Sequence, residues 1–98
     1  MDFGEAIRVL KGGGRVRRAG WNGKGMWLAL TPGTTVPTAG VISGSTHLRG
    51  AALSLFHSEA PDAIRIGAHI DMRAADGTLV IGWHASQPDM LSDDWETV

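Results

Sequence analysis

The spacing of apolar residues near the start of the chain predicts an amphipathic helix over residues 2–11. Apolar side chains recur there at intervals that place them on one helix face, namely Phe3, Ala6, Ile7 and Leu10. Asp2 is expected to cap the helix, and Glu5 three residues later completes a capping-box-like pair. Three glycines then end the helix, with Gly12 expected in the left-handed conformation that closes many helices.

The rest of the chain has the shorter period of β-strands, separated by residues typical of tight turns. Residues 64–72 alternate between apolar and polar positions, which predicts a half-buried strand with His69 and Asp71 on its polar face. Asn22-Gly23 and Asp76-Gly77 favour hairpin turns because these residues tolerate positive φ. Further strands are expected at 15–18, 26–30, 51–56, 78–83 and 94–98, and a single helical turn at 87–92.

Residues 31–50 are rich in Pro, Gly, Ser and Thr, which predicts a long loop in the middle of the chain. A short strand is expected within it at Val36 or at 41–42. A loop of this length in a small domain is a candidate lid or subunit contact, with mere tolerance of insertions as the alternative. The fold class predicted is α+β, in one domain over residues 1–98: an N-terminal helix packed on a small, mainly antiparallel β-sheet, with a long Pro/Gly-rich central loop.

Composition narrows the classes of function that fit this fold. The 98 residues include no cysteine, which excludes disulfides, thiolate zinc sites and cysteine nucleophiles. No apolar run is long enough to cross a bilayer, and the acidic N-terminus is unlike a signal peptide, so a cytoplasmic location is expected. A net charge of −1 argues against binding to a nucleic acid polymer, although a modest basic cluster fits one or two phosphates or an ordinary solvated face. That cluster is Lys11, Arg15, Arg17 and Arg18.

The aromatic residues are dominated by tryptophan, with four Trp, two Phe and no Tyr. Trp21, Trp83 and Trp95 stand at the edges of predicted elements, where pockets open. Indole rings there can stack on a base, with polar neighbours to bind its edge or a ribose, or they can fill the ends of a small core. The sequence leaves these two interpretations evenly balanced.

His69, Asp71 and His84 form the most catalytic-looking group, because imidazoles and a carboxylate together can relay a proton or bind a metal ion. No metalloprotease motif or nucleophile elbow accompanies them. Polar sheet residues that hydrogen-bond to their neighbours are the favoured interpretation. A nucleotide hydrolase using this group remains the enzyme alternative, and an oligomeric protein-interaction module is a third; no catalytic residue, metal site or cofactor is predicted.

Several strings taken together resemble the small phage-encoded Thoeris anti-defence proteins of the second type. The most specific are Trp-Asn-Gly-Lys-Gly-Met at 21–26 and Ser-Gln-Pro-Asp-Met-Leu-Ser-Asp-Asp-Trp at 86–95, joined by Met-Asp-Phe-Gly-Glu-Ala at 1–6 and His-Ile-Asp-Met at 69–72. The resemblance covers both ends of the chain and the hairpin between them. The segment from 37 to 68 is more individual than in the shortest relatives.

The resemblance implies a protein that sequesters, without turnover, the cyclic ADP-ribose-type signal made by TIR immune enzymes in an infected bacterial host. It also implies a homotetramer with ligand pockets between subunits, and uptake of CBASS cyclic dinucleotides by some members. One pocket wall is then expected to hold Trp21, Asn22 and Trp27, and the facing wall Trp83, Ser86, Gln87, Asp89 and Met90. His69 and Asp71 would orient ribose hydroxyls or build the subunit contact, and Arg17, Arg18 and Lys24 would bind phosphate.

Overall fold

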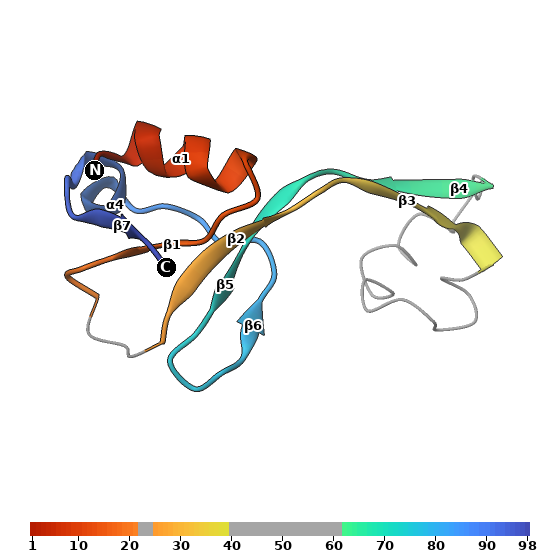
Figure 1. Ribbon diagram of the computed structural model, residues 1–98. Coiled ribbons are helices and arrows are strands. Elements are labelled where there is room, and N and C mark those ends of the chain that lie inside the picture. Colours follow the sequence, from red (N-terminus) through yellow and green to blue (C-terminus); the bar gives the residue numbers. More distant parts are fainter. Residues whose placement is uncertain (22–24, 40–61) are drawn as a thin grey trace. The chain divides into compact units, whose positions relative to one another are not determined.

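The computed structural model describes residues 1–21, 25–39 and 62–98, and the chain divides into two compact units (Figure 1). The first unit comprises Met1–Pro32 and Ala68–Val98, and the second Gly33–Gly67. The first unit contains the elements α1 (Phe3–Lys11), β1 (Val16–Arg18), β2 (Trp27–Thr31), β5 (His69–Arg73), β6 (Leu79–Val80), α4 (Gln87–Leu91) and β7 (Trp95–Thr97). The described part of the second unit contains β3 (Thr34–Pro37) and β4 (Ala63–Ile66).

Helix α1 forms as its apolar spacing predicts. The Asp2 side chain accepts a hydrogen bond from the Glu5 backbone N–H at 2.8 Å, which confirms Asp2 as the N-cap. Ala6 and Leu10 are completely buried on the face turned to the sheet. The expected left-handed residue is Gly13, with φ of +91°, and not Gly12, which keeps a right-handed helical conformation. The helix therefore ends at Lys11 as expected, and the left-handed glycine follows one position later than expected.

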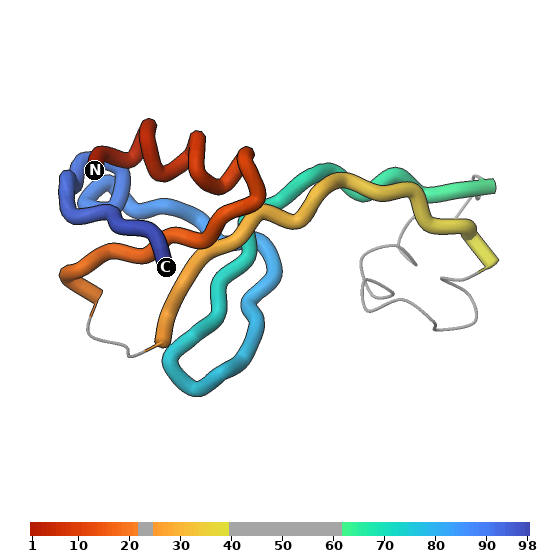
Figure 2. The backbone as a smooth tube through the Cα atoms, in the orientation of Figure 1, coloured from red at the N-terminus to blue at the C-terminus, as the bar shows by residue number. Residues whose placement is uncertain are grey.

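The first unit is built on a five-stranded antiparallel sheet in the order β6-β5-β2-β1-β7. Its central pair, β2 and β5, aligns Leu28 with Met72, while β1 and β2 align Val16 with Leu28. Since alternate residues of a strand point to opposite faces, these side chains lie on one face of the sheet, against α1. Figure 2 shows the first residues of the chain beside β7, where the Trp95 backbone N–H donates to the Met1 carbonyl at 3.1 Å.

The core of this unit lies between α1 and the sheet. Its fully buried members are Ala6, Leu10, Val16, Leu28 and Trp95. Trp95 is the largest of them and is only 2% exposed, and its indole N–H donates to the Asp89 carbonyl at 2.9 Å. This bond satisfies the indole's polar group inside the core and ties α4 to β7. The helical turn and the closing strand predicted near the C-terminus are both confirmed.

The second unit has a two-stranded antiparallel ribbon of β3 and β4, with Val36 opposite Ile64. The strand expected at Val36 is confirmed, whereas those expected at 41–42 and 51–56 lie outside the described residues, as does the turn at Asn22-Gly23. Taken together, the helix and the antiparallel strands confirm the α+β fold class.

Two of the predicted strands do not form over their full expected length. Residues 64–72 do not form one strand, because the chain leaves regular structure at Gly67 and Ala68; β4 before this break pairs with β3, and β5 after it pairs with β2. Residues 78–83 yield only the two residues of β6, since Gly82 adopts a φ of +83° and turns the chain. Among the described residues, no helix is long and apolar enough to cross a membrane.

Candidate functional site

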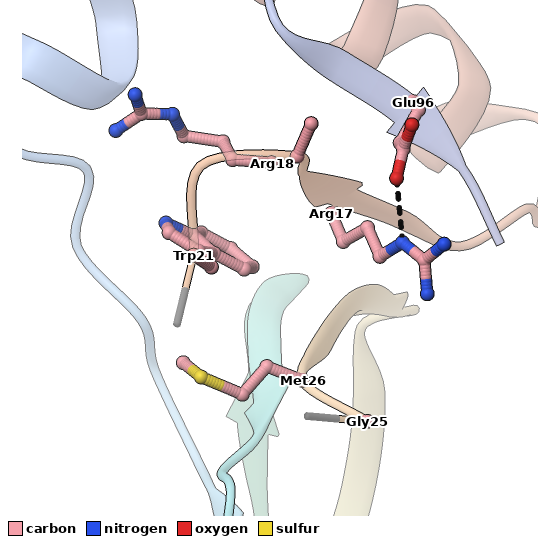
Figure 3. A pocket seen from close by; sticks show the side chains of 7 residues that line it. Arg17, Arg18, Trp21, Gly25, Met26 and Glu96 are labelled. Atoms are coloured by element: carbon pink, nitrogen blue, oxygen red, sulfur yellow. Dashed lines mark hydrogen bonds and ion pairs between the residues drawn. The ribbon is translucent and has the colours of Figure 1, made fainter. Parts of the chain in front are cut away.

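A cavity of about 280 Å³ opens in the first unit where β1 ends and β2 begins (Figure 3). Its lining combines charged, aromatic and thioether groups: Arg17, Arg18, Ala19, Trp21, Gly25, Met26 and Glu96. Figure 3 shows the Trp21 ring between the Arg18 stem and the Met26 side chain, with Arg17 and Glu96 to one side. An indole face beside a guanidinium can hold a planar ring and an anion together.

Strand register places the two opposite charges of this cavity together. Arg17 on β1 lies directly opposite Glu96 on β7, and their side chains share one face of the sheet. The Arg17 Nε donates to Glu96 Oε1 at 2.8 Å. The two side chains are 47% and 44% exposed, so this ion pair is solvated and breaking it costs little free energy.

Arg18 has a different role from its neighbour, because its charge is held by two carboxylates. Its Nε donates to Asp94 at 2.9 Å and its Nη1 to Asp89 at 2.8 Å. The hydrogen bonds that Arg18 donates to Asp94 and, to a smaller extent, to Asp89 raise the pKa of Arg18. In Figure 3 its guanidinium points away from Arg17 and Glu96. Arg18 therefore presents its aliphatic stem to the cavity and its charge to the chain around α4.

Asp94 in turn holds the loop that carries Trp21. The Gly20 N–H donates to Asp94 Oδ2 at 2.9 Å, and a Cβ at Gly20 would stand 2.9 Å from this same oxygen, so a larger residue would displace the Asp94 carboxylate. Burial raises the pKa of Asp89, but hydrogen bonds from Arg18 and Ser86 outweigh it and leave that pKa below its usual value. The hydrogen bond from Arg18 likewise lowers the pKa of Asp94. Both groups are thus held as carboxylates that fix Arg18.

Four aromatic rings meet beside the cavity. Trp21 makes edge contacts with Trp95, at a centroid distance of 5.4 Å, and with Trp83, at 6.4 Å. Phe3 of α1 contacts the same two rings, at 5.3 Å and 6.5 Å. Trp95 is core, whereas Trp21 both packs against the core and lines the cavity. The core-filling interpretation is therefore confirmed for Trp95, whereas stacking of a base on Trp21 stays a prediction.

His69 and Asp71 lie in a separate hydrogen-bonded cluster on the other face of the sheet from α1. Their atoms Nδ1 and Oδ1 are 2.7 Å apart, and the Asp71 carboxylate also accepts from the Thr31 hydroxyl and from the Gly82 N–H at 3.0 Å. Burial raises the pKa of Asp71, yet these hydrogen bonds bring it below its usual value. The described residues contain no group of three His, Asp or Glu side chains arranged to hold a metal ion. This pair makes the hydrogen bonds to neighbours that the sequence favoured.

Comparison with known proteins shows the family to which the chain belongs. The model of the Thoeris anti-defense 2-like domain matches residues 1–98, the whole of the chain. The chain belongs to this family. It is also 34% identical over 98 residues to a protein of Bacillus phage SP01 named "Thoeris anti-defense 2", and the match covers all of this chain and 94% of that relative. Family membership supports an anti-defence role.

In this Thoeris anti-defense 2-like chain, the structure brings together only some of the residues expected to bind ligand. Arg17, Arg18 and Trp21 line the cavity, and Trp83 and Asp89 contact that lining from outside it. The remainder of the expected facing wall belongs to α4, where Ser86 is the N-cap in a capping box with Asp89, and Gln87 and Met90 are exposed.

Other predicted site residues lie elsewhere. Trp27 lies in β2 on the sheet face away from α1, with the Arg15 guanidinium carbon 5.2 Å from its ring centroid. Asn22 and Lys24 are outside the described residues.

Glu96 is a charged lining residue that the sequence did not single out, and the lining residues Ala19, Gly25 and Met26 were not predicted as site residues either. It stands in a short C-terminal strand with no motif around it, and only the pairing of β1 with β7 brings it to Arg17. A prediction of that pairing would have found it, because a glutamate and an arginine on facing strands are a stabilising cross-strand pair.

Proposed function

We propose that this protein binds and withholds small cyclic nucleotide signals of bacterial immunity, without chemically changing them. The ligands proposed are cyclic ADP-ribose isomers made by TIR enzymes of Thoeris, and for a second ligand class the cyclic dinucleotides of CBASS. Removal of the signal would leave the downstream effector inactive in the infected bacterial cytoplasm. The chain's membership of an anti-defence family is the setting for this proposal.

The observation that carries the proposal is the pairing of an indole and a guanidinium in one cavity. Trp21 offers a ring face on which a purine can stack, and Arg17 offers an accessible cation for a phosphate. Cyclic ADP-ribose isomers contain both a purine and phosphates. One side of such a ligand would thus contact Trp21 while its anionic part reaches Arg17.

The hydrogen bonds of Asp71 favour sequestration over hydrolysis. A general base must reach the proton that it abstracts. The oxygens of Asp71 already accept from Thr31, His69 and the Gly82 N–H, and this cluster does not contribute to the cavity lining. The arrangement supports a structural role for His69 and Asp71, with the cavity used for binding.

Cavity size supports assembly into a homo-oligomer, which we propose to be a tetramer. At about 280 Å³ the cavity lies just below the range of roughly 300–1,000 Å³ that encloses most small ligands. A signal present at low concentration is removed only by tight binding, near a nanomolar Kd or about −12 kcal/mol. Enclosure by a second copy would bury more of the ligand, so affinity and assembly are expected to rise together.

The test is to recover the ligand after binding. Protein in excess is mixed with a cyclic ADP-ribose isomer, the mixture is filtered, the protein is denatured, and the released nucleotide is analysed by mass. Depletion from the filtrate followed by intact release supports sequestration. Hydrolysed fragments would establish catalysis instead, and an undepleted filtrate with each cyclic ADP-ribose isomer and cyclic dinucleotide would favour a protein-interaction module.

A further inference from the structure

We propose that Glu96 is a specificity-determining residue that limits the charge of the ligand. In this account, which rests on the proposed function, the carboxylate disfavours linear nucleoside polyphosphates relative to cyclic nucleotides with fewer charges. The sequestered signals are then distinguished from the abundant linear nucleotides of the cell by their charge as well as their shape.

The charges of the cavity lining carry the inference. Glu96 Oε1 lies 2.8 Å from Arg17 Nε, so the accessible cation of the lining is faced by an anion. Among the lining residues that the structure describes, the third charged one is Arg18, which is bound by Asp94 and Asp89 and directs its guanidinium away from this pair (Figure 3). The described lining therefore offers a neutralised Arg17 and no surplus positive charge.

Glu96 does not need to leave for a phosphate to bind. Its bond to Arg17 uses Nε, and both side chains are about half exposed, so the outer guanidinium nitrogens remain accessible to an acceptor. A bound phosphate would then lie within a few ångströms of the Glu96 carboxylate. Because like charges repel in proportion to their number, the penalty doubles from a dianion to a tetraanion.

This penalty matters because specificity is a difference between affinities. Repulsive groups discriminate against the wrong ligand at a modest cost to the right one. A cyclic ADP-ribose isomer carries two phosphate charges near neutral pH, whereas ATP without magnesium carries up to four. A purine-stacking site with a free arginine would bind both ligands. Glu96 lowers the affinity for ATP more than the affinity for the cyclic ligand.

The test compares two probes, cyclic ADP-ribose isomers and magnesium-free ATP, on the wild type and on Glu96→Gln at fixed ionic strength. Glutamine keeps the size of the side chain and removes its charge. We expect Glu96→Gln to bind the cyclic ligand about threefold more tightly and ATP about tenfold more tightly, since the second effect is near the square of the first. Glu5→Gln is the matched control: it removes one negative charge from exposed α1, outside the cavity lining, and should change neither affinity by more than about twofold.

The other outcomes of this comparison bear on the charge limit and on sequestration separately. Equal gains for both ligands, or none, would overturn the charge limit while leaving sequestration intact. Weaker binding of the cyclic ligand by Glu96→Gln would also overturn it, because it would mean that Glu96 accepts hydrogen bonds from the ligand. Absence of any binding to the wild type would refute the proposed function, and the charge limit with it. Thermal unfolding should show that both variants are folded, because Glu96→Gln loses only an exposed ion pair and Glu5→Gln only an exposed charge.

Discussion

Replacement of Trp21 by alanine tests the two roles of this ring, which packs against the core and lines the cavity. Stacking of one base on an aromatic side chain contributes about 1–3 kcal/mol, so Trp21→Ala should raise the Kd for a cyclic ADP-ribose isomer by roughly 5- to 150-fold. The same change removes two edge contacts, to Trp95 and Trp83, each worth about 0.5–1.5 kcal/mol beyond burial. Unfolding free energies of small domains are about 5–15 kcal/mol, so most of the variant should remain folded.

Phe3→Ala is the matched control for this experiment. Phe3 contacts the same two rings as Trp21, at nearly the same distances, but it does not line the cavity. Both variants should lose stability in urea unfolding, whereas only Trp21→Ala should lose affinity in calorimetry. The reasoning is refuted if folded Trp21→Ala binds as tightly as the wild type, or if Phe3→Ala loses as much affinity.

Three further variants test the framework around the site. The pKa of Asp71 is lowered in the folded state, so its carboxylate stabilises the fold above the unfolded pKa of about 3.8, and this stability is lost as the pH falls through the folded pKa. Asp71→Asn should therefore lower the Tm at pH 7 and flatten the decline of Tm between pH 5 and 3. Parallel Tm curves for the wild type and the variant would contradict this. Gly20→Ala should lower both Tm and ligand affinity, since the new Cβ meets Asp94 at 2.9 Å, and an unchanged affinity would show that this loop does not position Trp21. Asp2→Ala should cost about 0.5–2 kcal/mol in urea unfolding by loss of the cap on α1, while leaving the Kd of the folded protein unchanged.

Local signals predicted the elements whose determinants are neighbours in sequence. Asp2 and Glu5 defined the start of α1, and Ser86 with Asp89 forms the capping box of the turn expected near the C-terminus. The break between β4 and β5 was not predicted, because the apolar alternation continues through Gly67 while the partners change from β3 to β2. Pairing partners are not visible in a single strand's pattern.

The candidate site was predicted in part for the same reason. Arg17 and Arg18 were expected to bind phosphate and Trp21 to line a pocket wall, and the lining of the cavity contains all three. Glu96 is 79 residues from Arg17, and its importance depends on strand pairing. The sequence also could not show that Arg17 and Arg18 have different roles, since these roles depend on which carboxylates the fold brings to each guanidinium.

The most direct measurement of the central claim is calorimetric titration of the intact protein with cyclic ADP-ribose isomers, paired with thermal unfolding at saturating ligand. We expect a Kd near the nanomolar range for at least one isomer, and a Tm that rises with ligand concentration because the ligand binds only the folded state. No binding heat and no rise in Tm with any isomer, in protein that is folded and at the concentration of its assembled form, would contradict the claim that this cavity holds a cyclic nucleotide signal.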